Sequence, residues 1–131
     1  MGNVAGTVVL DANALMMPFQ SRMNLDSELE RLFGEVICLV PSSVLGELNG
    51  LREKHAKAAL ALARKYEIVE TDKRGDDAVI DVAERRSAVV LTNDRELIDR
   101  LRELGIGVVR LRSGRHLVRV SEWDGELSAG R

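Results

Sequence analysis

Short apolar runs alternate with longer amphipathic segments along this chain. Residues 8–10, 36–40 and 88–91 are continuous apolar runs, and a polar residue follows each of them within two positions. Runs of this length and continuity are typical of strands that are buried on both faces of a parallel sheet. Weaker runs predict two further strands at 68–69 and 108–109, and residues 117–120 are a candidate for an added edge strand.

The segments between these runs carry helical signals. Apolar residues recur at helical spacing from Leu25 to Phe33, and Gly34 then predicts the end of that helix. Further helices are predicted over about 41–52, 55–65, 75–83 and 95–104. We expect a turn at 11–13 and a loop or a short helix at 16–24, because no clear period is present there.

Strands that are separated by helices of this length imply right-handed parallel crossovers. We therefore expect an α/β fold: a three-layer α/β/α sandwich around a central, mostly parallel sheet of four to five strands. A chain of 131 residues suits one compact domain, which we place at 1–120. Residues 121–131 lose all periodicity and are expected to form a loose C-terminal tail.

Composition excludes several classes of protein. Hydrophobic residues make up 45% and charged residues 31% of the chain, as in ordinary globular domains. Only 3% are aromatic, which argues against a module that binds single-stranded bases by stacking. The one cysteine, Cys38, lies in an apolar run and is expected to be a small buried hydrophobe. No run is long enough to span a bilayer and residues 1–10 do not resemble a signal peptide, so we expect a cytoplasmic protein without a membrane segment.

The charge pattern favours binding of nucleic acid in only one stretch of the chain. The net charge is −2, so the molecule as a whole does not attract phosphate. From Arg95 to Arg119, however, seven arginines stand against three acidic residues. Each arginine alone is typical of a solvated helix face with paired charges. The alternative is that they form a weak electrostatic track for a phosphate backbone.

Several carboxylates fall near one edge of the predicted sheet. Asp11 and Asp94 follow the first and fourth strands, and open parallel sheets bind ligands beyond the carboxyl ends of their strands. Asp76 and Asp77 open the helix that leads into the fourth strand. Glu47 lies one turn into the helix after the second strand. We expect all of them to point toward the same edge.

Each of these residues also has a purely structural interpretation. Asp11 suits a turn cap, Asp76 a helix N-cap, and Glu47 an exposed position on a helix. Asn93 with Glu96 fits a capping pair three residues apart. Taken singly, the structural interpretation is the better one at every position.

As a set, the carboxylates point to a metal site. Like charges a few ångströms apart raise one another's pKa and cost stability unless a cation compensates them. Oxygen ligands alone favour Mg²⁺ or Mn²⁺ over Zn²⁺. The two histidines, His55 and His116, lie in a charged helix and in the basic stretch, where we expect surface residues. Such a cluster suits phosphodiester hydrolysis, in which metal ions activate a water and stabilise the leaving oxygen.

Four segments resemble, in order, the motifs of PIN domains. They are VVLDANAL, PSSVLGEL, GDDAVI and VVLTNDREL, at residues 8–15, 41–48, 75–80 and 89–97. One such motif alone is weak, but four in order, over about 8–112, are specific. The chain is similar to archaeal PIN proteins of the ribosomal-RNA-processing branch and to VapC-type toxins. The resemblance implies a parallel sheet flanked by helices and an endoribonuclease that depends on Mg²⁺ or Mn²⁺.

The resemblance also implies roles for individual residues. The acids that would bind the metal and act in catalysis are, by position, Asp11, Glu47, Asp77 and Asp94. Asp76 would be an accessory ligand or a helix cap. The residues that would hold these ligands in place are Asn13, Thr92 and Asn93.

Within the family two biological roles are open. The protein is expected to cleave RNA either as the toxin of a toxin–antitoxin pair or in the processing of ribosomal RNA. Its partners would accordingly be an antitoxin or ribosome-assembly factors. The Leu- and Ala-rich helices leave apolar surface to spare, and a homodimer is a further hypothesis.

Two other functions compete with a ribonuclease. A PIN fold that binds RNA or protein without catalysis would also explain the basic stretch. A phosphatase of the haloacid dehalogenase type would use Asp11 as the nucleophile, but that chemistry needs a second aspartate two residues later, where this chain has Asn13. We therefore prefer the metal-dependent endoribonuclease.

Overall fold

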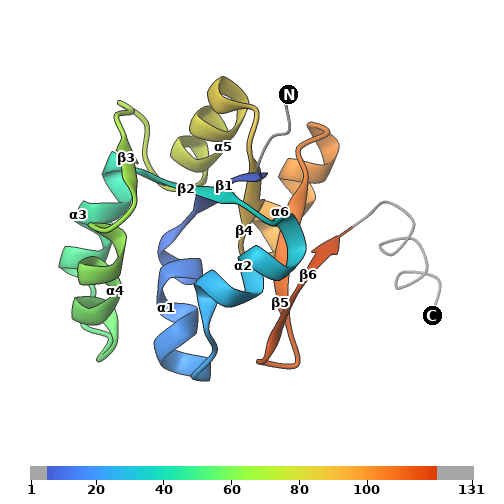
Figure 1. Ribbon diagram of the computed structural model, residues 1–131. Coiled ribbons are helices and arrows are strands. Elements are labelled where there is room, and N and C mark those ends of the chain that lie inside the picture. Colours follow the sequence, from blue (N-terminus) through green and yellow to red (C-terminus); the bar gives the residue numbers. More distant parts are fainter. Residues whose placement is uncertain (1–5, 121–131) are drawn as a thin grey trace.

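The computed structural model describes residues 6–120, so the tail predicted at 121–131 lies outside the described residues. The strands form one sheet in the order β3-β2-β1-β4-β5-β6 (Figure 1). Their bounds are β1 (Gly6–Leu10), β2 (Val36–Pro41), β3 (Glu67–Val69), β4 (Val89–Leu91), β5 (Val108–Arg112) and β6 (His116–Val120). All neighbours pair in parallel except β5 and β6, which are antiparallel. The described sheet thus has one strand more than the expected four to five, because the edge run pairs along its whole length.

Helices cover both faces of the sheet (Figure 1). One face carries α1 (Ala12–Ser21), α2 (Leu25–Phe33), α3 (Ser42–Gly50) and α4 (Ala56–Ala63). The other carries α5 (Gly75–Arg86) and α6 (Arg95–Glu103). This arrangement confirms the three-layer α/β/α sandwich. None of the helices in the described part of the chain has the length and apolar composition needed to cross a bilayer.

The main departure from the predicted elements is α1. It occupies the places of the turn expected at 11–13 and of much of the segment at 16–24, for which a loop or a short helix was expected. The Asp11 carboxylate accepts the Ala14 N–H at 2.7 Å and so starts a helix where the sequence suggested a turn. Pro18 lies inside this helix, where it removes a backbone hydrogen bond. The proline therefore made the helix hard to predict from sequence, although tertiary packing stabilises it.

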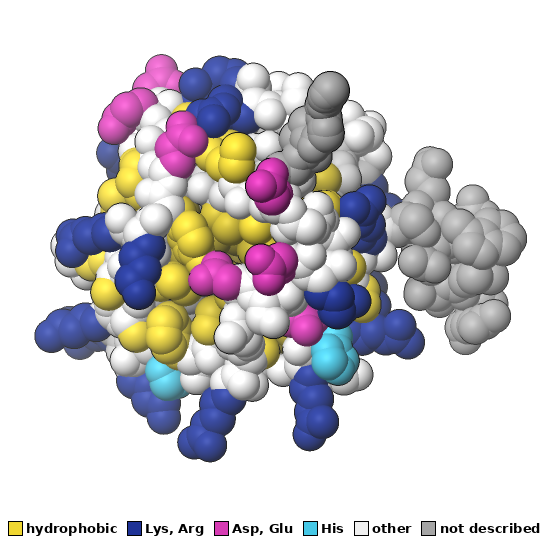
Figure 2. Space-filling model, viewed as in Figure 1, with side chains coloured by type: hydrophobic (Ala, Val, Ile, Leu, Met, Phe, Trp, Pro, Cys, Tyr) yellow, Lys and Arg dark blue, Asp and Glu magenta, His cyan; other side chains and the backbone are white. Residues whose placement is uncertain are grey.

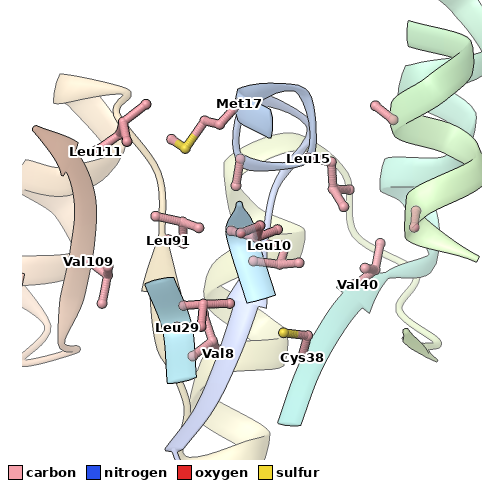
Figure 3. Packing of buried hydrophobic residues seen from close by; sticks show 14 of the residues in the cluster. Val8, Leu10, Leu15, Met17, Leu29, Cys38, Val40, Leu91, Val109 and Leu111 are labelled. Carbon is pink, nitrogen blue, oxygen red and sulfur yellow. The ribbon is translucent and has the colours of Figure 1, made fainter. Parts of the chain in front are cut away.

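A close-packed core joins the sheet to the helices on its first face (Figure 3). The labelled side chains from the strands and the helices meet there: Val8, Leu10, Val40, Leu91, Val109 and Leu111 with Leu15, Met17 and Leu29. Cys38 lies in the same cluster with 7% of its surface exposed, and burial raises the pKa of its thiol to about 12. It is the small buried hydrophobe that the sequence predicted.

Two side chains of α2 bind the free edge of β6 near its start. Glu28 accepts the Leu117 N–H at 2.8 Å, and Arg31 donates to the Leu117 carbonyl oxygen at 2.7 Å. The two side chains also pair with each other at 2.9 Å. Because unpaired backbone groups make an edge strand a template for other chains, this contact protects the edge and fixes α2 against it.

We expect the substitution Glu28→Gln to weaken the acid sensitivity of the fold. Bonds from Arg31 and from the Leu117 N–H lower the pKa of Glu28 from 4.5 to about 2. The folded-state pKa is therefore below the unfolded one, so the stability it provides is present above about 4.5 and is lost as the pH falls toward 2. Glutamine keeps an acceptor for Leu117 but not the charge, and should lower the free energy of unfolding by about 1 kcal/mol at pH 7.

Urea unfolding as a function of pH tests this prediction. The loss of unfolding free energy between about pH 4.5 and pH 2 should be smaller in Glu28→Gln than in the wild type. Glu30→Gln, an exposed change on the same helix, serves as the control and should leave the loss unchanged. An identical pH profile for Glu28→Gln and the wild type would contradict the assignment.

Candidate metal centre at the carboxyl edge

The carboxyl edge is the side of the sheet at which β1 to β5 end and where α1, α3, α5 and α6 begin. β1 and β4 are neighbours, and Leu10 pairs with Leu91 in their parallel register. One residue further along, Asp11 is level with Thr92, and Asp94 follows two residues later at the start of α6. The structure therefore brings the first and the last of the candidate acids to the same place.

Asp11 lies at the centre of the electrostatic coupling at this edge. Burial raises the pKa of Asp11 to about 6, although hydrogen bonds from the Ala14 N–H and the Thr92 hydroxyl lower it. The negative charges of Asp76 and Asp94 raise it further. Carboxylates from three elements thus act on one another, and a cation placed among them would relieve that repulsion.

Thr92 connects two of these acids. It is completely buried and is the one buried polar or charged residue within 6–120. Its hydroxyl bonds to Asp11 and also accepts the Asp94 N–H at 3.1 Å. Asp94 in turn caps α6 by accepting the Leu97 N–H at 3.2 Å. Such contacts are the ones that a residue holding ligands in place requires.

Asn13 and Asn93 form a brace behind the acids. The Asn13 side-chain oxygen accepts the Asn93 N–H at 3.0 Å. The Asn93 side chain accepts the Leu111 N–H at 2.7 Å and donates to the Leu111 carbonyl oxygen at 3.2 Å. The expected capping pair of Asn93 with Glu96 is wrong, because Asp94 is the cap of α6 and the Asn93 side chain is used on β5.

Glu47 reaches the start of α5 from α3. Its Oε2 accepts the Gly75 N–H at 3.2 Å, so this carboxylate caps a helix whose own N-cap, Arg74, makes no side-chain capping bond. The expected N-cap role of Asp76 is therefore wrong, and Asp76 lies in the first turn instead. A carboxylate there is favoured by the positive end of the helix dipole.

The structure separates the neighbours Asp76 and Asp77. Burial and then the charge of Asp94 raise the pKa of Asp76, while Arg100 lowers it. The Asp77 side chain is 65% exposed and pairs with Arg100 at 2.9 Å. Successive residues of a helix point about 100° apart, so the two carboxylates face different ways. The family resemblance implied Asp77 as the core ligand, whereas Asp76 is the one of the two whose charge is coupled to Asp94.

A network of side chains positions the loop before α5. The Ser42 hydroxyl accepts the Thr71 N–H at 3.1 Å and donates to the Thr71 carbonyl oxygen at 3.4 Å. The Thr71 hydroxyl donates to Asp81 at 2.9 Å, and Arg85 pairs with the same carboxylate at 2.9 Å. Because this loop leads directly into α5, the network determines where Asp76 lies. These contacts join distant segments, and no sequence motif marks them.

Ser43 is a candidate that the sequence patterns did not single out. It lies in the first turn of α3, and four residues later Glu47 occupies the same helix face. Its Oγ is buried and has no hydrogen-bond partner within the described residues. A buried hydroxyl without a partner costs roughly 1–3 kcal/mol, and an ion or water at a functional site is one explanation for it.

The donors fit a divalent cation by their chemistry. Within residues 6–120, no three His, Cys, Asp or Glu side chains converge into a group that could hold a metal ion as they stand. Instead, three carboxylates each give one oxygen to a helix start, namely Asp11, Glu47 and Asp94. All donors at the edge are carboxylate and hydroxyl oxygens, which Mg²⁺ and Mn²⁺ prefer. The unpartnered Ser43 hydroxyl, on the same face of α3 as Glu47, is a further oxygen of this kind.

Neither histidine is grouped with these acids. His116 lies at β6 with 67% of its side chain exposed, 3.4 Å from Glu28, as expected of a surface residue. His55 is half-buried, because its ring stacks on Phe19 with 6.5 Å between the ring centroids. Among the described residues, the candidate donors at the edge are therefore oxygen atoms without a histidine.

Relatives of this chain are found by sequence. A family model described as a PIN like domain matches residues 8–114. The chain is 33% identical over 122 residues to ribonuclease VapC9 of Archaeoglobus fulgidus, which covers 88% of this chain and 90% of that protein. It is also 31% identical over 121 residues to ribonuclease VapC4 of Methanocaldococcus jannaschii. This alignment covers 83% of the chain and 92% of that protein.

Solved structures show the same fold. The PIN domain endonuclease Utp24 superposes with a TM-score of 0.73 at 23% identity, over 87% of this chain and 92% of that one. A domain of a Methanocaldococcus jannaschii protein of unknown function superposes with a TM-score of 0.59 at 16% identity. That superposition covers 89% of this chain and 99% of the domain. At these identities the likeness shows the fold alone. Together with the family model and the two sequence relatives, it leads to one conclusion: the chain belongs to the PIN-like domain family.

Proposed function

We propose that this protein is an endoribonuclease that uses a divalent metal ion at the carboxyl edge. The observation that carries the proposal is the set of mutually repelling carboxylates of Asp11, Asp76 and Asp94, which come from three elements. Buried Thr92 contacts two of the three residues. The relatives named ribonuclease VapC9 and ribonuclease VapC4 support RNA as the substrate.

In this proposal each residue of the edge has a distinct task. Asp11, Asp76 and Asp94 hold the ion, and Glu47 and the Ser43 hydroxyl are the donors from α3. Thr92 and the Asn13–Asn93 brace keep the ligands in place. When bound, the ion lowers the pKa of a water molecule and stabilises the leaving oxygen of the phosphodiester. Asp77 lies outside this set, paired with Arg100.

The biological role follows the sequence relatives. Because the relatives above 30% identity carry the VapC name, we propose a VapC-type toxin rather than a ribosomal-RNA-processing enzyme. An antitoxin is then the expected partner, and a homodimer remains part of the proposal. Mg²⁺ and Mn²⁺ are the proposed ions, since the donors at the edge are oxygen atoms.

A PIN fold without catalysis is the second candidate. The observation that favours it is that no three donor side chains within 6–120 converge as they stand. A phosphatase of the haloacid dehalogenase type has no such support, because the Asn13 side chain is used as a brace to Asn93. Cleavage of RNA by the pure protein separates the two remaining candidates.

Adjacent aspartates provide a matched test of the site. We expect Asp76→Asn to reduce Mn²⁺-stimulated cleavage of single-stranded RNA by at least about 100-fold, because losing a ligand should exceed the loss of an outer contact. Asp77→Asn should change the rate little, because that side chain is exposed and paired with Arg100. Cleavage is measured on gels with purified variants. Equal losses in the two variants would overturn the distinction between them.

Asp11→Asn and Asp94→Asn should abolish cleavage without lowering the thermal melting temperature. Asparagine is as good an N-cap as aspartate, so α1 and α6 keep their capping bonds. The measurement pairs a cleavage assay with a melt followed by circular dichroism. Full activity in both variants would refute the metal site. Salt-sensitive RNA binding by the wild type that persists in EDTA, without any turnover, would favour the non-catalytic candidate.

Mn²⁺ binding should strengthen as the pH rises through about 6. Asp11 has a folded-state pKa of about 6, above its usual value of 3.8, so its contribution to stability is full below 3.8 and is lost as the pH rises through 6. A metal ion competes with the same proton, so affinity should fall about tenfold per pH unit below 6. Calorimetry of Mn²⁺ binding measures this slope. In Asp11→Asn the slope between about pH 5 and pH 6 should disappear, and an unchanged slope would exclude Asp11 as the competing group.

Ser43→Ala should separate stability from metal affinity. Removing an unpartnered buried hydroxyl should leave the free energy of unfolding of the metal-free protein unchanged or higher. Mn²⁺ affinity, measured by calorimetry, should fall about tenfold. The neighbouring change Ser42→Ala removes the bonds to Thr71 and should cost about 1 kcal/mol of stability. Unchanged Mn²⁺ affinity in Ser43→Ala would remove Ser43 from the site.

A further inference from the structure

A hollow of about 480 Å³ lies between α2 and the β5–β6 hairpin. Its lining residues are Arg31, Arg112, Ser113, His116 and Val118. All but one of these side chains carry a polar or charged group. Figure 2 shows Lys and Arg side chains gathered around the lower ends of β5 and β6, with a histidine and an acidic side chain among them.

The hollow opens beside the acidic edge. The register of β4 and β5, continued by the two hydrogen bonds between Asn93 and Leu111, places Arg112 level with Asp94. Adjacent strands lie about 5 Å apart, so β5 is one strand from Asp94 and about 10 Å from Asp11 at the end of β1. The hairpin is therefore within reach of a strand of RNA that is bound at the acids.

The charges of the hollow favour a polyanion. Arg31 is neutralised by Glu28 and is tied to the backbone of β6. Within residues 6–120, Arg112 forms no ion pair, and the same holds for Arg115 in the hairpin turn. Glu28 is the carboxylate that contacts the lining, at 2.9 Å from Arg31 and 3.4 Å from His116. The excess positive charge of the lining therefore comes from Arg112, and Arg115 adds a second cation in the adjoining hairpin turn.

We propose that this hollow binds backbone phosphates of the RNA strand whose scissile bond lies at the acidic edge. The inference rests on the proposed function, since it takes RNA as the substrate. The planar guanidinium of Arg112 matches a phosphate group in shape, and Ser113 and His116 add hydrogen-bonding groups. Phosphate contacts position a nucleic acid without reading its sequence. The hollow thus positions the strand, while the acids act on it.

RNA binding without cleavage tests the proposal. Anisotropy of a fluorescein-labelled single-stranded RNA is followed in EDTA with the Asp11→Asn variant as the background. Replacing both hairpin arginines, by Arg112→Gln with Arg115→Gln, should weaken binding at low salt by at least about tenfold. It should also reduce the slope of log affinity against log salt by about 1.4, because each lost phosphate contact to a single strand removes about 0.7.

Matched controls distinguish the hollow from bulk charge. Arg64→Gln with Lys65→Gln removes the same charge at the end of α4, which packs beyond the opposite end of the sheet, and should leave binding and slope nearly unchanged (Figure 1). Arg112→Lys should restore part of the slope, because the charge returns, but not the full affinity, because the planar fork is lost. Circular dichroism melts confirm that the variants are folded.

Each outcome decides for or against the hollow. Equal losses in the hairpin and α4 variants would show bulk attraction and overturn the proposal. Tighter, arginine-dependent binding of a poly-glutamate peptide, with RNA binding unchanged, would assign the hollow to an acidic protein partner and also overturn it. Arginine-dependent RNA binding supports the proposal even if the wild type does not cleave RNA, in which case the proposed nuclease alone fails. If the wild type cleaves RNA but its RNA binding does not depend on Arg112 and Arg115, the proposed nuclease stands and the proposed phosphate-binding hollow fails.

Discussion

The start of a helix leaves backbone N–H groups without partners, and a parallel sheet gathers several such starts at one edge. In this protein Asp11, Asp94 and Glu47 satisfy the starts of α1, α6 and α5. The same requirement that concentrates oxygen acceptors at the edge also concentrates negative charge there. The capping and metal-binding interpretations of these acids are therefore compatible, because a carboxylate has two oxygens and a cap uses one.

Much of the fold could be predicted from local patterns. Continuous apolar runs located the central strands, and the parallel topology that they imply brought Asp11 and Asp94 to one edge. Pro18 hid most of α1, because single-residue propensities do not include the packing of Leu15 and Met17 against the sheet. Local signals predict an element well where the chain agrees with them and poorly where tertiary contacts prevail.

The membership of the site was harder to predict than its location. Sequence places Asp76 and Asp77 equally, and the choice between them depends on the rotation of α5, which the long-range bonds between Thr71, Ser42 and Asp81 help to set. Ser43 lies inside one of the PIN-like segments but was not singled out there, since a serine that opens a helix is commonplace. It becomes a candidate because its buried hydroxyl has no hydrogen-bond partner within the described residues. Only the three-dimensional structure shows that.

The central strand β1 has a consequence for how this molecule is made. Its partners β2 and β4 are about 30 and 80 residues away along the chain, whereas β5 and β6 pair locally. Non-local pairings close long loops and form slowly, while a hairpin forms early. The acids at positions 11, 47, 76 and 94 therefore meet only when β4 has paired with β1. A partly folded chain, such as one still emerging from the ribosome, carries some of these acids but no assembled centre. Any activity therefore begins with the finished fold.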